Sequence, residues 1–298
     1  MDVSIIIVNY NTKVLTSQCI NSIYEKTQGI SFEVILVDNA SIDGSKEHFQ
    51  SDSRVRYIYS EENLGFGRAN NLGVSVASGL NILFLNPDTV LINNAVKILV
   101  DYTNNHPYVG ACCGNLYDGD MRPTLSFKRI FPGILDELNN LLFHIPEKIF
   151  YGKSWFYNVS NQAISVANVS GADMMVKKTV LDQVGTFSPD FFMYYEETDL
   201  CYRIHCNGYK LMSLPFAKIQ HLEGKSFQSS VNVKRLRLSE QGRMVFYKRN
   251  YSINYQFVAN TIYRIALYIH QIVYILLGNT CKANTCKCRR TILSEIIK

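Results

Sequence analysis

The sequence predicts an α/β protein with a doubly wound sheet, followed by a helical C-terminal extension. Three observations support this prediction. Short apolar runs alternate with helical patterns over the first half of the chain, polar residues follow most of these runs, and an amphipathic pattern appears near the C-terminus. Strands that alternate with helices are typical of a sheet covered on both faces.

The first half of the chain contains five expected strands, which are apolar almost throughout, as in parallel sheets buried on both faces. They cover Val3–Val8, Phe32–Val37, Val55–Tyr59, Asn81–Leu85 and Val109–Leu116. The expected helices between them cover Thr16–Glu25, Gly44–Phe49, Gly67–Ala77 and Asn93–Asn104. Ligands of such sheets bind at the carboxyl ends of the strands. Those ends carry Asn9-Tyr10-Asn11, Asp38-Asn39, Glu61-Glu62-Asn63 and Asn86-Pro87-Asp88.

The stretch 118–166 has an irregular pattern, with prolines and one expected helix over Gly133–Phe143. We expect this stretch to be an insertion that shapes the pocket of a second substrate. A loop then enters a helix expected over Thr198–Asn207, and Gly208 is well placed to cap its end. The predicted domains are therefore a catalytic domain over 1–228, which includes the insertion, and a helical extension over 229–298.

The extension is expected to contain an amphipathic helix over residues 255–277. Its apolar stripe consists of Val258, Ile262, Ile265, Ile269, Ile272 and Leu276. Arg264, His270 and Gln271 interrupt the apolar run, so a membrane-spanning helix is not expected.

Charge is distributed unevenly along the chain. The net charge is +5, yet residues 225–298 hold 13 Lys and Arg against two Glu, whereas residues 1–224 carry a net charge of −6. A basic, amphipathic extension predicts contact with an anionic membrane surface, and packing of its stripe on the catalytic domain or on a second subunit is the alternative. Eight cysteines without a signal peptide favour a reduced, cytoplasmic protein.

An acidic cluster is the most informative feature of the sequence. Glu196, Glu197 and Asp199 directly follow the bulky run Phe191-Phe192-Met193-Tyr194-Tyr195. Carboxylates beside such bulk lose hydration and repel one another, which raises at least one pKa, as in a general base. The alternative is that all three acids only cap a helix, or that Asp199 pairs with Arg203 four residues on.

Several blocks together resemble the family 2 inverting glycosyltransferases of the GT-A fold. They are Val3 to Asn11, Val37 to Ser41, Asn63 to Gly73, Asn86 to Asp88, Gly171 to Met175, the acidic cluster and His221. The resemblance covers roughly residues 3 to 250 and is strongest to the rhamnosyltransferase-like subgroup of bacterial surface polysaccharide synthesis. It implies a doubly wound mixed sheet and transfer of a sugar from a nucleoside diphosphate donor, dTDP-rhamnose or a UDP-sugar, to an acceptor hydroxyl.

The resemblance also implies roles for single residues. Glu197 stands where the family has its general base, usually Asp, and Glu196 is the second candidate. Donor-binding residues would be Asn9, Asn11, Asp38, Asn63, Gly65, Arg68, Asn70 and Asp88. Asp88 and His221 would hold Mg²⁺ or Mn²⁺, although Asn86 stands where the fuller metal motif has a second acid. Considered singly, Asp38 and Asp88 are common turn acids, Arg68 is a common solvated arginine, and a lone histidine is usually structural.

Two alternative functions stay open at this stage. The turn Gly65-Phe66-Gly67 resembles the start of a dinucleotide fingerprint and would indicate a nucleotide-dependent oxidoreductase. An inactive protein of the same fold that binds carbohydrate or membrane is the other. For the transferase, the expected acceptor is a glycan on a lipid carrier, the expected location is the inner face of the cell membrane, and nucleic acid is not an expected partner.

Overall fold

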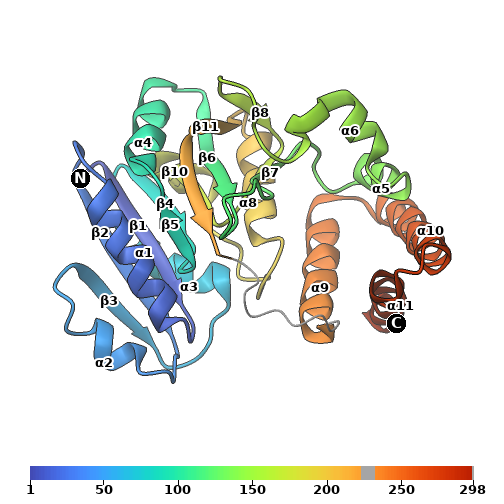
Figure 1. Ribbon diagram of the computed structural model, residues 1–298, viewed down its shortest axis with the longest axis horizontal. Helices are drawn as coiled ribbons and strands as arrows, with labels where there is room; N and C mark the ends of the chain where they lie inside the picture. The colour runs from blue at the N-terminus through green and yellow to red at the C-terminus, as the bar shows by residue number, and fades with distance from the viewer. Residues whose placement is uncertain (223–231, 297–298) are drawn as a thin grey trace. The chain divides into compact units, whose positions relative to one another are not determined.

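The computed structural model describes residues 1–222 and 232–296. The chain forms two compact units, and each is described by itself (Figure 1). Unit 1 contains Met1–Arg129, Lys153–Pro189 and the segment that begins at Glu196, whereas unit 2 contains Ile130–Gly152, Asp190–Tyr195 and the C-terminal helices. The predicted boundary at residue 228 lies outside the described residues, and part of the predicted insertion belongs with the C-terminal helices.

Unit 1 is built on a mixed sheet with the strand order β3-β2-β1-β4-β10-β6-β11-β5, and β8 pairs with β11. Its strands are β1 (Val3–Asn9), β2 (Phe32–Asn39), β3 (Val55–Ser60), β4 (Asn81–Leu85), β5 (Thr89–Leu91), β6 (Val109–Tyr117), β8 (Ile164–Val166), β10 (Asp173–Lys177) and β11 (Lys210–His221). The first four strands of the order run parallel, whereas β10 is antiparallel to both β4 and β6. A separate small sheet pairs β7 (Phe127–Lys128) with β9 (Asn168–Val169).

Helices cover both faces of this sheet, as the sequence predicts (Figure 1). They are α1 (Lys13–Lys26), α2 (Ser45–Phe49), α3 (Phe66–Val76), α4 (Ala95–Asn105), α7 (Lys178–Val184) and α8 (Glu196–Cys206). Successive side chains of β1 point to opposite faces of the sheet, so neighbouring residues pack against different helices. Ile5 and Ile7 belong to the core shared with α1 and α4, whereas Ile6 faces α3. A Cβ atom on Gly73 would lie 2.5 Å from Ile6 Cγ2, so this glycine allows α3 to approach the sheet. The predicted strands and helices of the first half are confirmed to within a few residues, and Gly208 follows α8 with φ +85° as a cap should.

Unit 2 is helical and more extensive than predicted. Its helices are α5 (Ile134–Leu141), α6 (Ile145–Tyr151), α9 (Val233–Asn250), α10 (Ile253–Leu276) and α11 (Thr280–Ile296), and the 3₁₀ turn η1 (Gly152–Trp155) follows α6. The sequence predicted one helix near α5 and one near α10, and both exist. It did not predict that α5 packs against α10, because that contact joins segments more than 100 residues apart.

A buried ion pair holds the helices of unit 2 together. Arg243 of α9 donates from Nε and Nη2 to Glu137 Oε1 of α5, at 3.0 and 2.6 Å, and both residues are about 4% exposed. Its Nη1 donates to Asn260 of α10 at 2.7 Å, and the guanidinium lies between the rings of Tyr247 and Tyr263. A second buried acid, Glu240, pairs with Arg289 of α11. Paired in this way, buried charges specify which helices meet.

Helix α10 has two faces of different kinds. Ala259, Tyr263, Ala266, Leu267 and His270 are buried within unit 2. The exposed side also carries Thr261 and Arg264 but is mostly apolar. We call its apolar residues the α10 apolar face: Phe257, Val258, Ile265, Tyr268, Ile269, Ile272, Ile275 and Leu276. Most of the predicted stripe lies on this exposed face. Among the described residues, no helix is both long enough and apolar enough to cross a bilayer.

Candidate active site

The carboxyl ends of β1 and β2 form the first part of the site. Asn9 is fully buried; its Oδ1 accepts hydrogen bonds from the hydroxyls of Thr12 (2.8 Å) and Thr16 (2.9 Å), and its Nδ2 donates to Ser41 (2.9 Å). Asn11 is exposed in a left-handed conformation and accepts a hydrogen bond from the amide of residue 42 at 2.8 Å. Asn9 therefore joins the two loops, and Asn11 lies on the rim that they form.

Asp38 lies at the end of β2 and is fully buried. Its Oδ1 accepts a hydrogen bond from the Ser41 amide at 3.0 Å, and its Oδ2 accepts one from the Tyr57 hydroxyl at 2.8 Å. Burial, and then the hydrogen bond to Asp38, raise the pKa of Tyr57, so this phenol stays a proton donor. Each carboxylate oxygen has two lone pairs, so Asp38 retains acceptor capacity for a ligand.

The loop before α3 is fixed by a residue that the sequence did not single out as a site residue. Asn39 donates from Nδ2 to Asn63 Oδ1 (3.0 Å) and accepts from the amide of Leu64 (2.9 Å). Asn63 also accepts from the Gly65 amide (2.9 Å), and Gly65 has φ +80°, which favours glycine. The turn follows β3, at the edge of the sheet, rather than β1.

Two further residues that were predicted to bind the sugar donor interact with backbone carbonyls. Asn70 is buried, and its Nδ2 donates to the carbonyl of Phe66 at 3.0 Å. Arg68 donates from Nε and Nη2 to the carbonyl of Pro189, at 3.1 and 2.8 Å. Its guanidinium is thus oriented by the protein itself, and a phosphate contact remains a prediction.

Asp88 and His221 meet although 133 positions separate them in the sequence. β5 pairs with the end of β11 in a register that sets Thr89 opposite His221. Asp88 Oδ1 lies 3.2 Å from His221 Nε2, and Asn86 Nδ2 lies 3.3 Å from the same nitrogen. A carboxylate and an imidazole that converge in this way fit a borderline cation such as Mn²⁺. Among the described residues, no three His, Cys, Asp or Glu side chains cluster closely enough to hold a metal.

The two candidate bases lie at the start of α8 and face different elements. A Cβ atom on Gly67 would lie 3.6 Å from Glu196 Cβ, which places Glu196 against the start of α3. A Cβ atom on Gly171 would lie 3.5 Å from Glu197 Cβ, which places Glu197 against the turn into β10. Glu196 is 4% exposed, whereas Glu197 is only half-buried. Glu197 is therefore the more accessible of the two carboxylates.

The candidate base and the Asp88–His221 pair belong to one edge of the sheet. The Asn86 amide donates to the carbonyl of Ala172 at 2.9 Å, and Ala172 directly follows the glycine that Glu197 packs against. Residues from β4, β10, β11 and α8 therefore converge within unit 1.

Burial dominates the electrostatics of both glutamates. It raises the pKa of Glu196 well above its usual range, and the neighbouring Glu197 raises it further. Burial also raises the pKa of Glu197, while its own backbone amide, Lys128 and the Thr198 hydroxyl oppose the shift. A carboxylate whose pKa is raised towards neutrality is suited to accept a proton at physiological pH.

The third acid of the cluster has a structural role. Asp199 Oδ2 accepts from Arg203 Nε at 2.8 Å, one helical turn on, as the spacing predicts. Arg203 also donates to the carbonyls of Val184, Gly185 and Thr186. Just before the cluster, Tyr194 and Tyr195 adopt φ of 71° and 73°, a costly conformation for two consecutive non-glycine residues and one that concentrates at functional sites.

Asp173, the first residue of β10, is a buried acid that the sequence analysis did not identify. It is fully buried; Oδ2 accepts from the Gly114 amide at 2.6 Å, and Oδ1 has no hydrogen-bond partner among the described residues. Burial raises its pKa to about 7. A buried polar atom without a partner is uncommon in native structures. In the sequence, a polar residue next to the apolar Met174 is an ordinary strand pattern, so nothing indicated that Asp173 would be buried.

Comparison with known proteins identifies the family. The model for "Glycosyl transferase family 2" matches residues 4–185. The low-salt glycan biosynthesis hexosyltransferase Agl10 of Haloferax volcanii is 28% identical over 208 residues, which cover 68% of this chain and 61% of that protein. An N-acetylglucosaminyl-diphospho-decaprenol L-rhamnosyltransferase of Mycobacterium tuberculosis is 25% identical over 215 residues, covering 65% of this chain and 67% of that protein.

A solved structure agrees in fold. The mannosyltransferase PcManGT from Pyrobaculum calidifontis, in complex with GDP-Man and Mn²⁺, superposes with a TM-score of 0.57 at 18% identity, over 96% of this chain and 73% of that one. The predicted GT-A fold, with its mixed sheet, is confirmed.

Asp173 should make the stability of the protein depend on pH. The folded protein holds the Asp173 proton up to about pH 7, whereas the unfolded chain releases it near 3.8. The contribution of Asp173 to the free energy of unfolding should therefore be greatest below pH 3.8 and should be lost as the pH rises through about 7. Between pH 5 and pH 8 the loss should be roughly 2–3 kcal/mol. Asp173→Asn keeps an acceptor for the Gly114 amide and cannot ionise, so it should lose this part of the decline. Urea unfolding of both proteins at the two pH values measures the difference, and parallel declines would contradict the assignment.

Proposed function

The chain belongs to glycosyl transferase family 2, and we propose that it transfers a sugar from a nucleoside diphosphate donor to an acceptor hydroxyl with inversion at the anomeric carbon. The observation that carries this proposal is the convergence of Glu197 with the Asp88–His221 pair at one edge of the sheet. An accessible base and a cation site at the same edge of the sheet suit a displacement in which one group activates the acceptor and the other faces the leaving group.

In this proposal Glu197 accepts the proton of the acceptor hydroxyl while the hydroxyl oxygen attacks the anomeric carbon. The bond between that carbon and the diphosphate oxygen breaks, so no covalent enzyme intermediate is required. Asp38, Asn63 and the loops at the ends of β1 and β2 hold the nucleotide. Asp88 and His221 would hold Mg²⁺ or Mn²⁺, which as a Lewis acid would stabilise negative charge on the departing diphosphate.

The relatives suggest the class of substrate. We propose a dTDP-rhamnose or UDP-sugar donor and an acceptor glycan on a lipid carrier, in the synthesis of a bacterial surface polysaccharide. The rhamnosyltransferase of Mycobacterium tuberculosis carries a diphospho-decaprenol acceptor in its name, which supports this choice.

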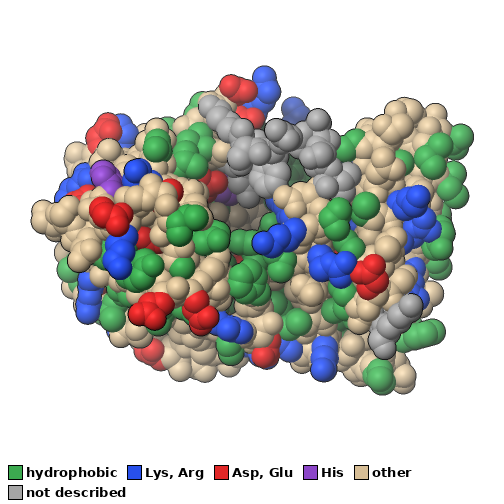
Figure 2. All heavy atoms as spheres, turned by 90° about the horizontal axis from the view of Figure 1, so that it is seen from below, with side chains coloured by type: hydrophobic (Ala, Val, Ile, Leu, Met, Phe, Trp, Pro, Cys, Tyr) green, Lys and Arg blue, Asp and Glu red, His purple; other side chains and the backbone are tan. Residues whose placement is uncertain are grey.

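Membrane contact is part of the proposal, and unit 2 would provide it. Besides the α10 apolar face, unit 2 exposes apolar residues of α5 and α6, among them Leu135, Ile149 and Phe150. Unit 2 has 14 Lys and Arg against six Asp and Glu. Basic and hydrophobic side chains occur together over the C-terminal helices in Figure 2. A net charge of +8 favours an anionic lipid surface over a second copy, since two such units would repel each other.

One part of the membrane hypothesis requires correction. From the sequence, the cations expected to meet anionic head groups are Lys248, Arg249, Lys282, Lys287, Arg289 and Arg290. Arg249 pairs with Asp190, Arg289 with Glu240, and Arg237 with Glu295, so these charges are already compensated within unit 2. Lys248, Lys282 and Lys287 are exposed and have no acidic partner among the described residues.

The metal prediction concerns Asp88. Addition of a nucleoside diphosphate with Mn²⁺ should raise the melting temperature of the wild-type protein, because a ligand that binds only the folded state stabilises it. Asp88→Asn should lose the metal-dependent part of this increase, and its turnover of the sugar donor should fall about a hundredfold or more. Near-normal turnover in Asp88→Asn would contradict the assignment. Wild-type protein that binds the nucleotide but never hydrolyses or transfers the sugar would favour the inactive, binding-only alternative.

The base prediction compares two neighbouring residues. Glu197→Gln preserves the shape of the side chain but cannot accept a proton, so the rate should fall by roughly 10²–10⁴ while donor affinity changes little. Glu196→Gln removes a buried, unpaired acid and should leave the rate within about tenfold of wild type. Single-turnover rates and donor titrations of both variants measure this, and a larger loss in Glu196→Gln would move the base to residue 196.

The membrane prediction uses the α10 apolar face. Ile265→Glu with Ile272→Glu places two charges on exposed positions, so the fold should persist while binding to anionic vesicles falls at least tenfold, since burying one isoleucine contributes about 1.5–3 kcal/mol. Leu80→Glu, at an exposed position of unit 1, is the matched control and should bind like wild type. Vesicle flotation at low and high salt measures the partition. Equal flotation of all three proteins, or conversion of a dimer to a monomer by the double substitution, would contradict the membrane assignment.

A further inference from the structure

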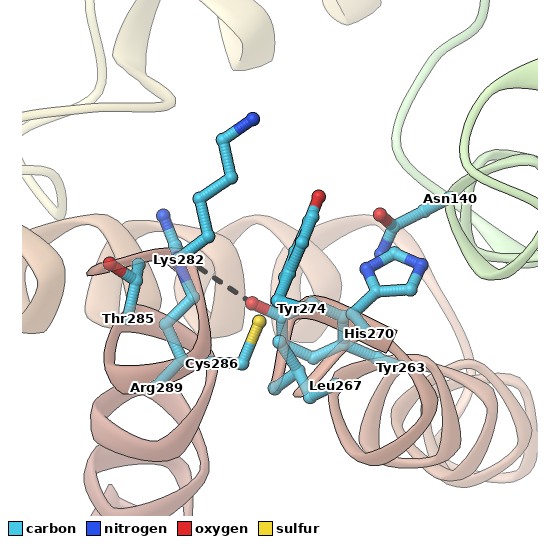
Figure 3. Close-up of a pocket in the computed structure, with 9 residues that line it drawn as sticks. All are labelled: Asn140, Tyr263, Leu267, His270, Tyr274, Lys282, Thr285, Cys286 and Arg289. Carbon is cyan, nitrogen blue, oxygen red and sulfur yellow. Dashed lines mark hydrogen bonds between the residues drawn. The ribbon is translucent and has the colours of Figure 1, made fainter. Parts of the chain in front are cut away.

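Unit 2 contains a cavity that the transferase proposal does not use. It measures about 320 Å³ and lies between α10 and α11, with Asn140 of α5 at one side (Figure 3). This volume is roughly ten times the share of one water molecule and falls in the range of small-ligand sites.

The charged side chains that line the cavity are cationic. Lys282 and Arg289 of α11 both line it, and no Asp or Glu does so among the described residues. Arg289 Nη1 pairs with Glu240, and the same nitrogen donates to the Tyr263 hydroxyl at 3.3 Å. Figure 3 marks the second of these interactions. The other nitrogens of this guanidinium have no hydrogen bond to the described residues. Arg289 is thus fixed in place and still has donors to offer.

Neutral donors surround these cations. The Lys282 Nζ lies 5.4 Å from the centre of the Tyr274 ring, and the amine and the Tyr274 hydroxyl point the same way in Figure 3. Thr285 adds a hydroxyl to the wall. Two cations with several hydroxyl donors form a set that suits the oxygens of a phosphate group.

His270 supplies an independent observation. It lines the cavity and is only 8% exposed, and its Nε2 has no hydrogen-bond partner among the described residues. Its ring packs on Phe143, with 4.0 Å between the centroids, so the ring is held in one orientation. A buried ring nitrogen without a partner is costly unless a ligand provides that partner.

The surroundings of the cavity favour a lipid as the source of the phosphate. Leu276 and Leu277 follow Tyr274 at the end of α10 and are 80% and 73% exposed. Exposed apolar side chains therefore lie within one helical turn of the cavity residue Tyr274. We propose that this cavity binds the phosphate group of an anionic phospholipid while Leu276 and Leu277 at the end of α10 contact the acyl chains. This inference rests on the membrane contact proposed above and is independent of sugar transfer.

Two substitutions in the full-length protein test the cavity. Lys282→Gln removes a cavity cation, and Lys287→Gln removes an exposed cation of the same helix outside the cavity, which serves as the matched control. Loss of any one lysine near an anionic surface should weaken binding about fivefold. Lys282→Gln should exceed this and lower binding to vesicles of phosphatidylcholine with phosphatidylglycerol at least twentyfold, while Lys287→Gln stays at or below fivefold. Vesicles of phosphatidylcholine alone should bind all three proteins weakly and equally.

His270→Phe changes no fixed charge and separates a ligand role from a structural role. It should keep the ring contact with Phe143 but lose the hydrogen bonding of the imidazole to the backbone at Leu141 and Asn140. The melting temperature should therefore fall only slightly, while binding to the anionic vesicles weakens at least fivefold. A lower melting temperature with unchanged binding would mean that the histidine is structural and would overturn the proposal. Equal losses in the two lysine variants would likewise overturn it.

Inorganic phosphate distinguishes a lipid from a soluble ligand. Millimolar phosphate should compete only weakly with the anionic vesicles, since it lacks the acyl contacts. If phosphate alone stabilises the wild-type protein through Lys282 and the vesicles do not bind, the site belongs to a soluble phosphate and the lipid assignment fails. All binding is measured without sugar nucleotide, so these outcomes leave the transferase proposal to its own tests.

Discussion

The candidate site depends on how two late strands enter a sheet that earlier strands begin. β1, β2, β3 and β4 run parallel and bring their carboxyl ends to one edge, where turn residues carry the donor candidates. β10 then pairs antiparallel between β4 and β6, and the end of β11 pairs with β5. These pairings bring Gly171 beside Asn86 and His221 beside Asp88. Without them, the edge would have the loops proposed to bind the sugar donor but neither the proposed metal pair nor the proposed base.

The sequence predicted those parts of the fold that local patterns determine. The apolar runs of the first half and the helices between them are where they were expected, and so is the Asp199–Arg203 pair, which requires only the spacing of one helical turn. The contact of Asp88 with His221 could be expected only from a family resemblance, since spacing alone says nothing about positions 133 residues apart. Asn39 and Asp173 lie within quoted motifs but received no role of their own, for a related reason. An asparagine after a strand is an ordinary turn residue, and an acid at the start of a short strand acquires meaning only through its burial.

In the C-terminal extension, the number of Lys and Arg residues overestimates the positive charge that is available on the surface. The sequence has a clear excess of cations there, yet Arg243 is buried against Glu137, and Arg289 against Glu240. Glu137 comes from a segment more than 100 residues earlier, which the charge count assigned to another domain. The apolar stripe, by contrast, was predicted well, because helical periodicity is local. What the pattern could not reveal is that α10 has a second, buried face of smaller and more polar residues.

Buried acids are paired with arginine in unit 2 but not in unit 1, and this difference supports a functional role for the acids of unit 1. In unit 2 both Glu137 and Glu240 are paired with an arginine and hydrogen-bonded by a tyrosine hydroxyl, as stability requires of a buried charge. In unit 1, no arginine pairs with Glu196 or Asp173 among the described residues, and burial raises the pKa of both carboxyls. The same chain can evidently provide arginine partners for buried acids. Buried acids without an arginine partner cost stability, and they lie beside the proposed base Glu197, in keeping with the enrichment of perturbed pKa values at functional sites.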